Sequence, residues 1–283
     1  MLELTGLDTI IRGLSYLYWA LGILALATVL WKAKRLWTKA IGALAVVAFF
    51  SFLPAKQWFE SREREAYARE AWAYFKKKCN ENAGQKIFKT FTDVKSVLVI
   101  RSLPPAVERD LYDQFWYGDP YSLALEGKNR TQIVAERLIA NVRLKKDPPN
   151  EEQGFEFVEV KAGEQYERLF PLPNPPFVRK DTVTISSSRF GVAWEDISTP
   201  EDRKNWVAAS RLRVVDLTDN SVVAERIGYL IEPGFGATGG ARRPWLTARG
   251  PSTTCPPLLN GDFEDRWFIF KALRPSKDSP GGR

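Results

Sequence analysis

Two apolar runs, separated by a dense basic segment, dominate the first 59 residues of the chain. Gly13 to Trp31 is almost continuously apolar, and Ala40 to Ala55 forms a shorter second run. A helix needs about 20 mostly apolar residues to cross the hydrocarbon core of a bilayer, a length that the second run reaches with its flanks. The pattern therefore predicts a transmembrane hairpin over residues 1–56, with helices at about 13–31 and 40–55. The alternative is a pair of buried helices in a large globular domain.

The residues that flank and line these runs favour insertion in a bilayer. Tryptophan stands at Trp19, Trp31, Trp37 and Trp58, near the expected membrane surfaces, where an indole can bury its ring and still hydrogen-bond. Small side chains recur along both runs and would let two helices approach closely: Gly22, Ala25, Gly42, Ala45 and Ala48.

The distribution of cations predicts how the hairpin is oriented. The connecting segment contains Lys32, Lys34, Arg35 and Lys39, whereas only Arg12 precedes the first run. Short positive loops stay in the cytoplasm, so both chain ends are expected outside it. The cations that follow the second run argue for the opposite orientation, but long domains translocate largely regardless of their charge.

Beyond the hairpin, the pattern changes to one amphipathic helix. Gln57 to Asn82 predicts a long helix that leaves the membrane, with Lys76, Lys77 and Lys78 near its end and Gly84 as a stop signal. Ala68, Trp72, Phe75 and Cys79 recur at helical spacing, which places Cys79 on the buried face of this helix.

The remainder of the chain mixes strand and helix patterns. Strands are predicted at 94–101, at 155–161 and 164–170 as a hairpin around Ala162-Gly163, at 182–194, and at 211–217 and 221–231. Helices are predicted at 106–116, at 131–142, and after Ser198-Thr199-Pro200, which has the residues of a helix start. Residues 267–273 fit a strand or a helical turn. We expect an α+β domain over residues 57–274, with a mainly antiparallel sheet and a few helices, and a flexible tail at 275–283.

Charge and composition exclude several classes of function. The chain contains 41 cations, 34 anions and no histidine. Six of the cations but only two of the anions precede residue 57, so the hairpin holds four of the seven net charges and the domain lacks the strongly basic character of a nucleic-acid-binding protein. Without histidine, a Ser-His-Asp or Cys-His nucleophile cannot form, and the commonest zinc ligand is missing. No catalytic residue, metal site or cofactor is therefore predicted.

An enzyme without histidine could still use carboxylates as its acid and base. Glu195-Asp196 is the most conspicuous acidic pair. Adjacent residues on a strand point to opposite faces, so the pair is better explained as the end of a strand that leads into a helix cap.

The two cysteines raise the question of a disulfide. Cys79 lies on the predicted helix, and Cys255 lies in the rigid segment Thr254-Cys255-Pro256-Pro257. An oxidising compartment would favour a bond between them, and two unrelated buried thiols are the alternative.

A glycine-rich segment near residue 236 carries the candidate binding residues. Gly234 to Gly239 fits the pattern G-x-G-x-x-G, but Pro244 and two arginines follow where a dinucleotide site needs a helix. The segment is expected to be a mobile loop. Its residue types are those that dominate protein-binding hot spots, so we predict a protein-binding surface that contains Phe235, Arg242, Arg243 and Trp245. An ordinary loop folded back on the sheet is the alternative.

Three segments resemble a family of bacterial inner-membrane proteins that have an N-terminal transmembrane hairpin, a single periplasmic domain and no known activity. These segments are Phe190 to Thr199, Ser210 to Tyr229, and Cys79 with the following Ala83 to Ile87. The resemblance implies a bacterial inner-membrane address with the C-terminal domain in the periplasm, and it supports pairing of the cysteines. It implies no catalytic residue.

These observations favour a membrane-tethered, non-catalytic protein-binding domain in the periplasm. Its partners would be the lipid bilayer and a protein: either a toxin that the chain neutralises as an immunity protein, or a subunit of an envelope or secretion complex to which it is accessory. A carboxylate-dependent enzyme or a small-ligand sensor of the envelope is the competing class.

Overall fold

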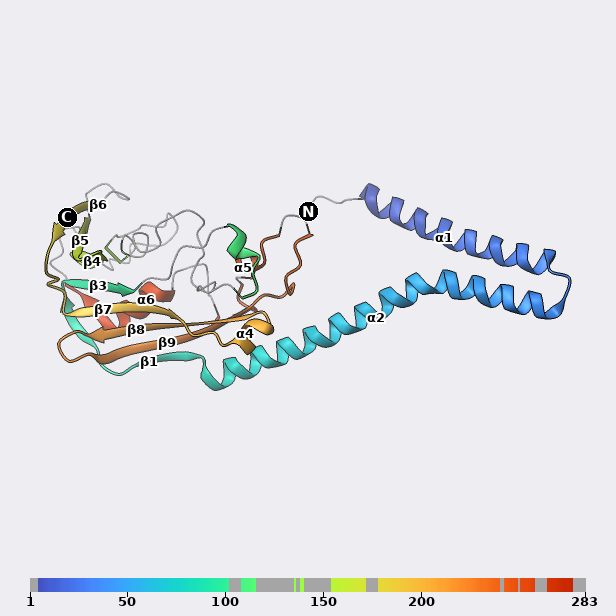
Figure 1. Cartoon of the computed structure of the whole chain (residues 1–283). Helices are drawn as coiled ribbons and strands as arrows, with labels where there is room; N and C mark the ends of the chain where they lie inside the picture. The colour runs from blue at the N-terminus through green and yellow to red at the C-terminus, as the bar shows by residue number, and fades with distance from the viewer. Residues whose placement is uncertain are drawn as a thin grey trace. The chain divides into compact units, whose positions relative to one another are not determined.

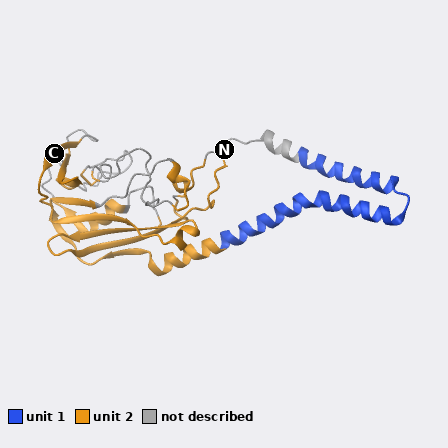
Figure 2. Ribbon diagram, viewed as in Figure 1, with its two compact units in different colours: residues 1–69 blue, residues 70–283 orange. Residues whose placement is uncertain are grey.

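The computed structural model describes most of the chain, in two compact units. The described residues are 5–101, 108–115, 135, 138–139, 154–171, 178–239, 242–248, 250–257 and 264–276, of which 5–12, 101, 108 and 264 are described by their backbone alone. The units are Met1–Arg69 and Glu70–Arg283, so the division lies within a helix, beyond the residue 56 that hydropathy suggested (Figure 2).

Two long helices form the first unit, and the second of them continues into the second unit (Figure 1). Helix α1 runs from Thr5 to Lys32, and α2 runs without interruption from Leu36 to Asn82. The predicted helices at 40–55 and 57–82 are therefore one helix, because Pro54 is accommodated within it. In their most apolar windows only 6% and 0% of the residues are buried, and both helices are long and apolar enough to cross a membrane.

A hydrogen bond between the two helices explains how α2 tolerates its proline. Proline has no N–H, so Pro54 leaves the carbonyl of Phe50, four residues earlier, without its helical donor. The hydroxyl of Tyr18 on α1 donates to that carbonyl oxygen at 2.6 Å. The rings of Tyr18 and Phe50 are also in contact, with centroids 5.2 Å apart, and Phe50 lies against Gly22. The small residue and the tyrosine thus fix the register of the hairpin.

The second unit is built on a mixed nine-stranded sheet. Its order is β1-β9-β8-β7-β3-β4-β5-β6, with β10 also paired to β9. Strand β3 is parallel to its neighbours β4 and β7, and the other pairs of this sheet are antiparallel. A parallel pair, β2 with β11, forms a separate two-stranded sheet. The bounds of the strands are Gly84–Ile87 (β1), Phe91–Val94 (β2), Ser96–Arg101 (β3), Phe157–Ala162 (β4), Gln165–Pro171 (β5), Val178–Val183 (β6), Phe190–Asp196 (β7), Val207–Asp216 (β8), Ser221–Ile231 (β9), Thr254–Cys255 (β10) and Leu273–Pro275 (β11).

Short helices complete this unit: η1 (Glu108–Leu111), α4 (Pro200–Lys204), α5 (Pro244–Thr247) and α6 (Glu264–Ala272). The start of α4 confirms the predicted signal, since the Thr199 hydroxyl accepts from the Asp202 N–H while the Asp202 carboxylate accepts from the Thr199 N–H, with Pro200 in the first turn. Residues 267–273, ambiguous in sequence, contain the last turns of α6 and the first residue of β11.

The antiparallel hairpins confirm the expected α+β class with a mostly antiparallel sheet. The β4–β5 hairpin turns at Gly163, whose φ is +66°, and β8 and β9 pair along their whole length. Two predicted strands were wrong in extent. Residues 94–101 divide into β2 and β3 at Lys95, and residues 182–194 divide into β6 and β7 around a serine-rich loop.

The two faces of the sheet are covered differently. Alternation along β8 sends Leu212 and Val214 to one face, where they join a core that includes Phe268 and Ile269 of α6 and the helical residues Leu138 and Ile139. Val207 and Ala209 belong to a second cluster with Ala71 and Phe75 of α2, Tyr229 and Ile231. The end of α2 therefore packs directly on the sheet, as its helical spacing predicted.

Several predicted features lie largely outside the described residues. Of the helix expected at 106–116 the structure describes residues 108–115, which contain η1, and of 131–142 it describes residues 135, 138 and 139, all helical. Residues 277–283 of the predicted tail are not among the described parts.

Candidate functional site

The glycine-rich loop predicted to bind a protein surrounds a buried carboxylate. Glu232 follows β9 and is completely buried. Its oxygens accept hydrogen bonds from the backbone N–H groups of Gly234 at 3.0 Å and Gly236 at 2.7 Å, and the Arg242 guanidinium forms an ion pair with it. The expectation of a mobile loop is corrected for this part of the chain: the loop is fixed because a buried carboxylate requires several partners.

The glycine spacing has a structural cause in these contacts. A Cβ atom at Gly234 would lie 1.7 Å from Nη1 of Arg242, and one at Gly236 would lie 2.4 Å from the Trp206 ring. Gly236 also has a φ of +80°, which disfavours other residues. At Gly234 and Gly236 the match to G-x-G-x-x-G therefore reflects close packing around Glu232 rather than the approach of a pyrophosphate, whereas a Cβ atom at Gly239 would meet open space.

Trp245, one of the four predicted binding residues, is an interior residue. Only 1% of it is exposed, and its indole N–H donates to the carbonyl of Asp113 at 2.7 Å. Its ring centroid lies 5.3 Å from that of Trp206, and the Arg203 guanidinium carbon lies 5.2 Å from the Trp245 ring centroid. In this structure Trp245 holds α5 against the segment around Asp113 and cannot be reached by a partner.

The other three predicted binding residues are half-buried. Phe235 packs against the cluster of α2 and the sheet that contains Val207 and Tyr229. Arg242 is the counterion of Glu232, with 24% of its side chain exposed. Arg243 directly precedes α5, where its carbonyl oxygen accepts from the Thr247 N–H. The structure brings the four residues into one region, and a role in partner binding stays a prediction for those that reach the surface.

The two cysteines meet where α2 ends on the sheet. The Sγ atoms of Cys79 and Cys255 are 1.96 Å apart, at disulfide-bonding distance, and both residues pack against the α2–sheet cluster. Cys255 lies on β10, which pairs with β9, so a bond here would join the end of α2 to the sheet.

Asp202, a buried aspartate on α4, interacts with two polar side chains of α2. Asp202 Oδ1 accepts from the Tyr74 hydroxyl at 2.8 Å and lies 3.2 Å from the Lys78 ammonium. Burial acts to raise the pKa of the Asp202 carboxyl, but the hydrogen bonds from Thr199, Tyr74 and Lys78 outweigh it and lower the pKa. Asp202 is therefore an ionised anchor for α2, and its geometry leaves no free position for a substrate proton.

The acidic pair at residues 195 and 196 divides as its strand position predicted. Glu195 contacts Arg211 and Arg213 on the neighbouring strand β8. Asp196 ends β7 and forms an ion pair with Arg203 at 2.7 Å, in which both side chains are nearly buried. The two carboxylates have different partners and do not form an acid–base pair.

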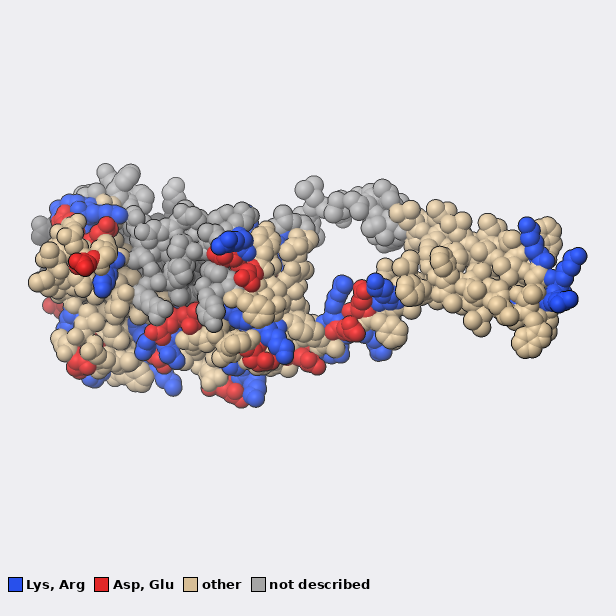
Figure 3. Space-filling view, in the orientation of Figure 1, with Lys and Arg blue, Asp and Glu red and all other residues tan. Residues whose placement is uncertain are grey.

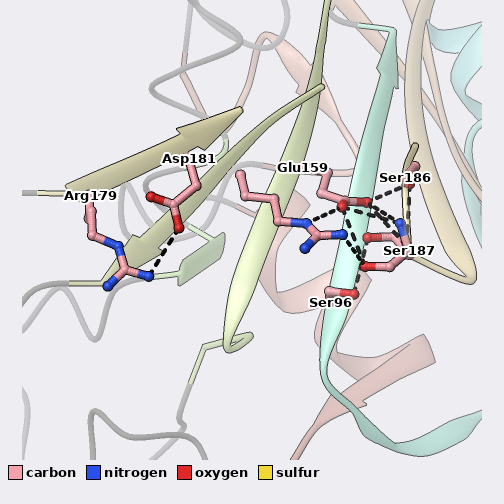
Figure 4. A network of polar contacts seen from close by, with 8 residues as sticks. Ser96, Glu159, Arg179, Asp181, Ser186 and Ser187 are labelled. Carbon is pink, nitrogen blue, oxygen red and sulfur yellow. Dashed lines mark hydrogen bonds and ion pairs between the residues drawn. The ribbon is translucent and has the colours of Figure 1, made fainter. Parts of the chain in front are cut away.

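A third buried carboxylate, not anticipated from the sequence, organises the loop between β6 and β7. Glu159 of β4 is completely buried, and Figure 4 shows it beside Ser186 and Ser187. Arg168 Nε donates to Glu159 at 2.7 Å, the backbone N–H groups of Ser187 and Ser188 donate at 3.1 to 3.2 Å, and the Ser186 hydroxyl donates as well. Ser188 extends this network to Ser96 of β3 at 3.0 Å.

The protonation of Glu159 argues against catalysis at this network. Burial alone would raise the pKa of the carboxyl, but the hydrogen bonds from Ser186, Arg168, Ser188 and the Ser187 backbone lower it to about 2. A carboxylate with so low a pKa is a weak base, and efficient acid–base catalysis needs a pKa near the working pH. The serines are donors to this anion rather than activated nucleophiles.

Neither of two cavities in the described parts of the chain has the character of a substrate site. One of about 70 Å³ is lined by Phe115, Ser198, Thr199, Pro200 and Arg203, and it is far below the several hundred Å³ of typical ligand pockets. One of about 630 Å³ lies on the α1–α2 hairpin, where its lining is almost entirely apolar. Among the described residues no group of acidic or cysteine side chains could hold a metal ion.

Sequence reasoning missed the buried carboxylates at 159 and 232, although both leave a trace. Glu232 is followed at once by Pro-Gly-Phe-Gly, and the Glu159 network draws on the consecutive serines 186–188. Neither pattern shows which residues contact the carboxylate. Those of Glu159 lie on β5 and in the loop before β7, and those of Glu232 lie in the glycine-rich loop.

Comparison with known proteins supplies no relative. No protein-family model, curated protein or solved structure shows significant similarity to the chain.

Proposed function

We propose that the chain is a membrane-anchored, non-catalytic binding protein of the bacterial envelope. The hairpin of α1 and α2 would lie in the inner membrane with its basic turn in the cytoplasm, and the sheet unit would work in the periplasm by binding a protein. The observation that carries the proposal is the exposure of the two long apolar helices, which a bilayer would cover.

The cysteine geometry supports a periplasmic position for the sheet unit. Cys79 and Cys255 lie at bonding distance although 176 positions separate them in the chain. Disulfides persist in the bacterial periplasm and are rare in the cytosol. An oxidised pair and a cytoplasmic turn require the same orientation of the hairpin.

The state of the buried polar groups supports binding over catalysis. Glu159, Asp202 and Glu232 each accept hydrogen bonds or ion pairs from several protein groups, so none is a free acid or base. The Asp196–Arg203 pair is likewise internal. These networks hold loops in fixed positions, which is what a recognition surface requires.

The proposed partner is another protein of the envelope, either an incoming toxin or a subunit of an envelope complex. Phe235, Arg242 and Arg243 are the predicted contact residues that are partly accessible, and Trp245 positions the segment from inside. Arginine can combine large contact area with directed hydrogen bonds at such a surface.

Topology is tested with reporters fused after Arg283. A reporter that is active only in the periplasm should work at this site. The short basic turn at residues 32–39 is expected to stay in the cytoplasm, which places both chain ends on the opposite side of the membrane. A silent periplasmic reporter together with an active cytoplasmic reporter would reverse the orientation and remove the proposed compartment.

Binding is tested by photo-crosslinking in cells, with a reactive amino acid at position 243 and, as a control, at the exposed Lys271 of α6. A discrete adduct at 243 alone should lead to a partner that, once purified, binds the full chain. Arg243→Ala should then weaken the complex by at least about 1 kcal/mol. Equal adducts at both positions would exclude this surface, and a small-molecule turnover abolished by one carboxylate substitution would replace binding with catalysis.

A further inference from the structure

The turn between α1 and α2 carries a concentrated positive charge that the chain itself does not neutralise. Lys32 ends α1, Lys34 and Arg35 lie in the turn, and Lys39 lies in the first turns of α2. The sequence contains no acidic residue between Asp8 and Glu60. Figure 3 shows basic side chains without acidic neighbours at the turn end of the hairpin, and within the described residues none of these four cations forms an ion pair.

Several cations of the sheet unit, by contrast, are neutralised by carboxylates of the chain. There, Arg168, Arg203 and Arg242 are each paired with a carboxylate that is almost completely buried. Even on the exposed face of α2, Lys56 and Arg64 both lie within 4 Å of Glu60. Cations that lack any acidic neighbour need an external anion or bulk water around them.

Apolar and aromatic side chains stand among these cations and limit what the external anion can be. Trp31 is 85% exposed, Leu36 82% and Trp37 80%. Indoles and a leucine beside lysines fit the boundary between headgroups and acyl chains, where the rings lie at the headgroup level. A fully aqueous partner, such as a nucleic acid, would leave these side chains in water.

We infer that the turn is a binding surface for the headgroups of anionic phospholipids. The phosphates of phosphatidylglycerol or cardiolipin would accept from Arg35, which can donate two parallel hydrogen bonds, and from the three lysine ammonium groups. Trp31, Leu36 and Trp37 would enter the layer directly below. The inference rests on the proposed insertion of the hairpin, and it goes beyond orientation because it predicts selection among lipids.

The test measures which lipids accompany the full chain in nanodiscs of phosphatidylethanolamine with one quarter phosphatidylglycerol. Native mass spectrometry of the released protein gives the ratio of the two bound lipids. For the unaltered chain, the ratio of bound phosphatidylglycerol to bound phosphatidylethanolamine should exceed the ratio in the bulk lipid at least about 5-fold. This is the effect expected of a single well-placed cation. Added salt should reduce the enrichment because exposed charges are screened.

The variant Lys32→Gln, Lys34→Gln, Arg35→Gln, Lys39→Gln should bring the bound ratio close to that of the bulk. Its matched control removes four exposed cations from the sheet unit: Lys76→Gln, Lys77→Gln, Lys86→Gln, Lys89→Gln. Both leaflets of a nanodisc have the same composition, so a reversed orientation in the membrane does not affect the readout. The pair Lys34→Gln, Arg35→Gln, which leaves both helices intact, serves if the fourfold variant fails to insert.

Three results separate this inference from the proposed function. Enrichment lost with the turn variant and kept in the control supports the inference. An inserted chain without enrichment, or with equal loss in the control, overturns it and leaves the anchor standing. A chain that alkaline carbonate extracts from membranes has no anchor, and both conclusions fall.

Discussion

Buried carboxylates decide the local structure at three places in the sheet unit. Glu159, Asp202 and Glu232 are at most 1% exposed, and each accepts from backbone N–H groups of a nearby loop or helix start. A buried anion costs several kcal/mol unless it is paired and hydrogen-bonded, so each of these groups imposes one conformation on its segment. One of the residues predicted to form a binding surface, Arg242, belongs to such a network because it is the counterion of Glu232.

Trp245 is predicted to act through stability rather than through direct contact. Trp245→Ala should lower the free energy of unfolding by about 3 to 5 kcal/mol, because it removes a fully buried ring and the donor to Asp113. Arg243→Ala, two residues earlier and half-exposed, should cost less than about 1 kcal/mol. Chemical unfolding of the full chain in detergent compares the two, and a stable Trp245→Ala variant would mean that the indole is not a packing residue.

Glu159 is predicted to make stability depend on acid pH. Its pKa of about 2 in the folded chain lies below that of an unfolded glutamate, so its contribution is complete above about pH 4.5 and is lost as the pH falls toward 2. The full effect is up to about 3 kcal/mol. Urea unfolding at pH 7, 5 and 3 should show a steeper acid loss for the unaltered chain than for Glu159→Gln. Glu164→Gln, in the exposed turn before β5, should follow the unaltered chain, and parallel curves for all three would refute the assignment.

At the scale of elements, α2 joins the two units and also meets α1. Its apolar part lies beside α1, and its last turns contact the sheet through Ala71 and Phe75, and α4 through Tyr74 and Lys78. Pro54 interrupts the backbone hydrogen bonds at Phe50, in the apolar part. The helix continues because a side chain from α1 supplies the missing donor.

Tyr18→Phe is predicted to weaken the hairpin, because in a bilayer the carbonyl of Phe50 would have no other donor. The loss should be about 0.5 to 2 kcal/mol, the range measured for interhelical hydrogen bonds in membranes. Tyr16→Phe is the matched control, since Tyr16 is 76% exposed on the same helix. Thermal unfolding in detergent, together with crosslinking between engineered cysteines on α1 and α2, reports the difference. An equal effect of the two substitutions would show that the Tyr18 hydroxyl has no special role.

At the scale of the whole molecule, the cysteine pair connects distant parts of the chain. Cys79 lies near the end of α2, and Cys255 lies on β10, 176 positions later in the chain. On the chain-entropy model a bond across so long a loop stabilises the fold by about 5 kcal/mol. The same bond would fasten the helix that leaves the membrane to the sheet.

We predict that Cys79 and Cys255 are oxidised in the native protein. Alkylation of purified membranes without reductant should leave the mass of the chain unchanged, and alkylation after reduction should label two thiols. Reduction should also lower the melting temperature, whereas the Cys79→Ser, Cys255→Ser variant should be insensitive to it. Two thiols that react without reductant would remove the bond and, with it, one support for a periplasmic domain.

Local patterns were sufficient for the elements whose causes are local. Continuous apolarity predicted the helical segments at 13–31 and 40–55, which lie within α1 and α2. Alternation and Ala162-Gly163 predicted the β4–β5 hairpin, and Thr199-Pro200 predicted the start of α4. Each depends on contacts within a few residues or on the solvent around one segment. The same reasoning failed at residues 182–194, where strand-forming composition continues but the chain turns, because Glu159 holds the serine loop.

By itself, then, the sequence determined two helices of membrane-spanning length, an α+β unit, and the absence of histidine-dependent chemistry, since periodicity and composition are properties of short windows. Only the tertiary structure decided the parallel position of β3 between β4 and β7, the approach of Cys79 to Cys255, and the burial of Trp245. These depend on which distant residues share a core. The partner of a buried group such as Trp245, whose indole donates to the carbonyl of Asp113, is set by chain closure across many residues, and no local pattern contains it.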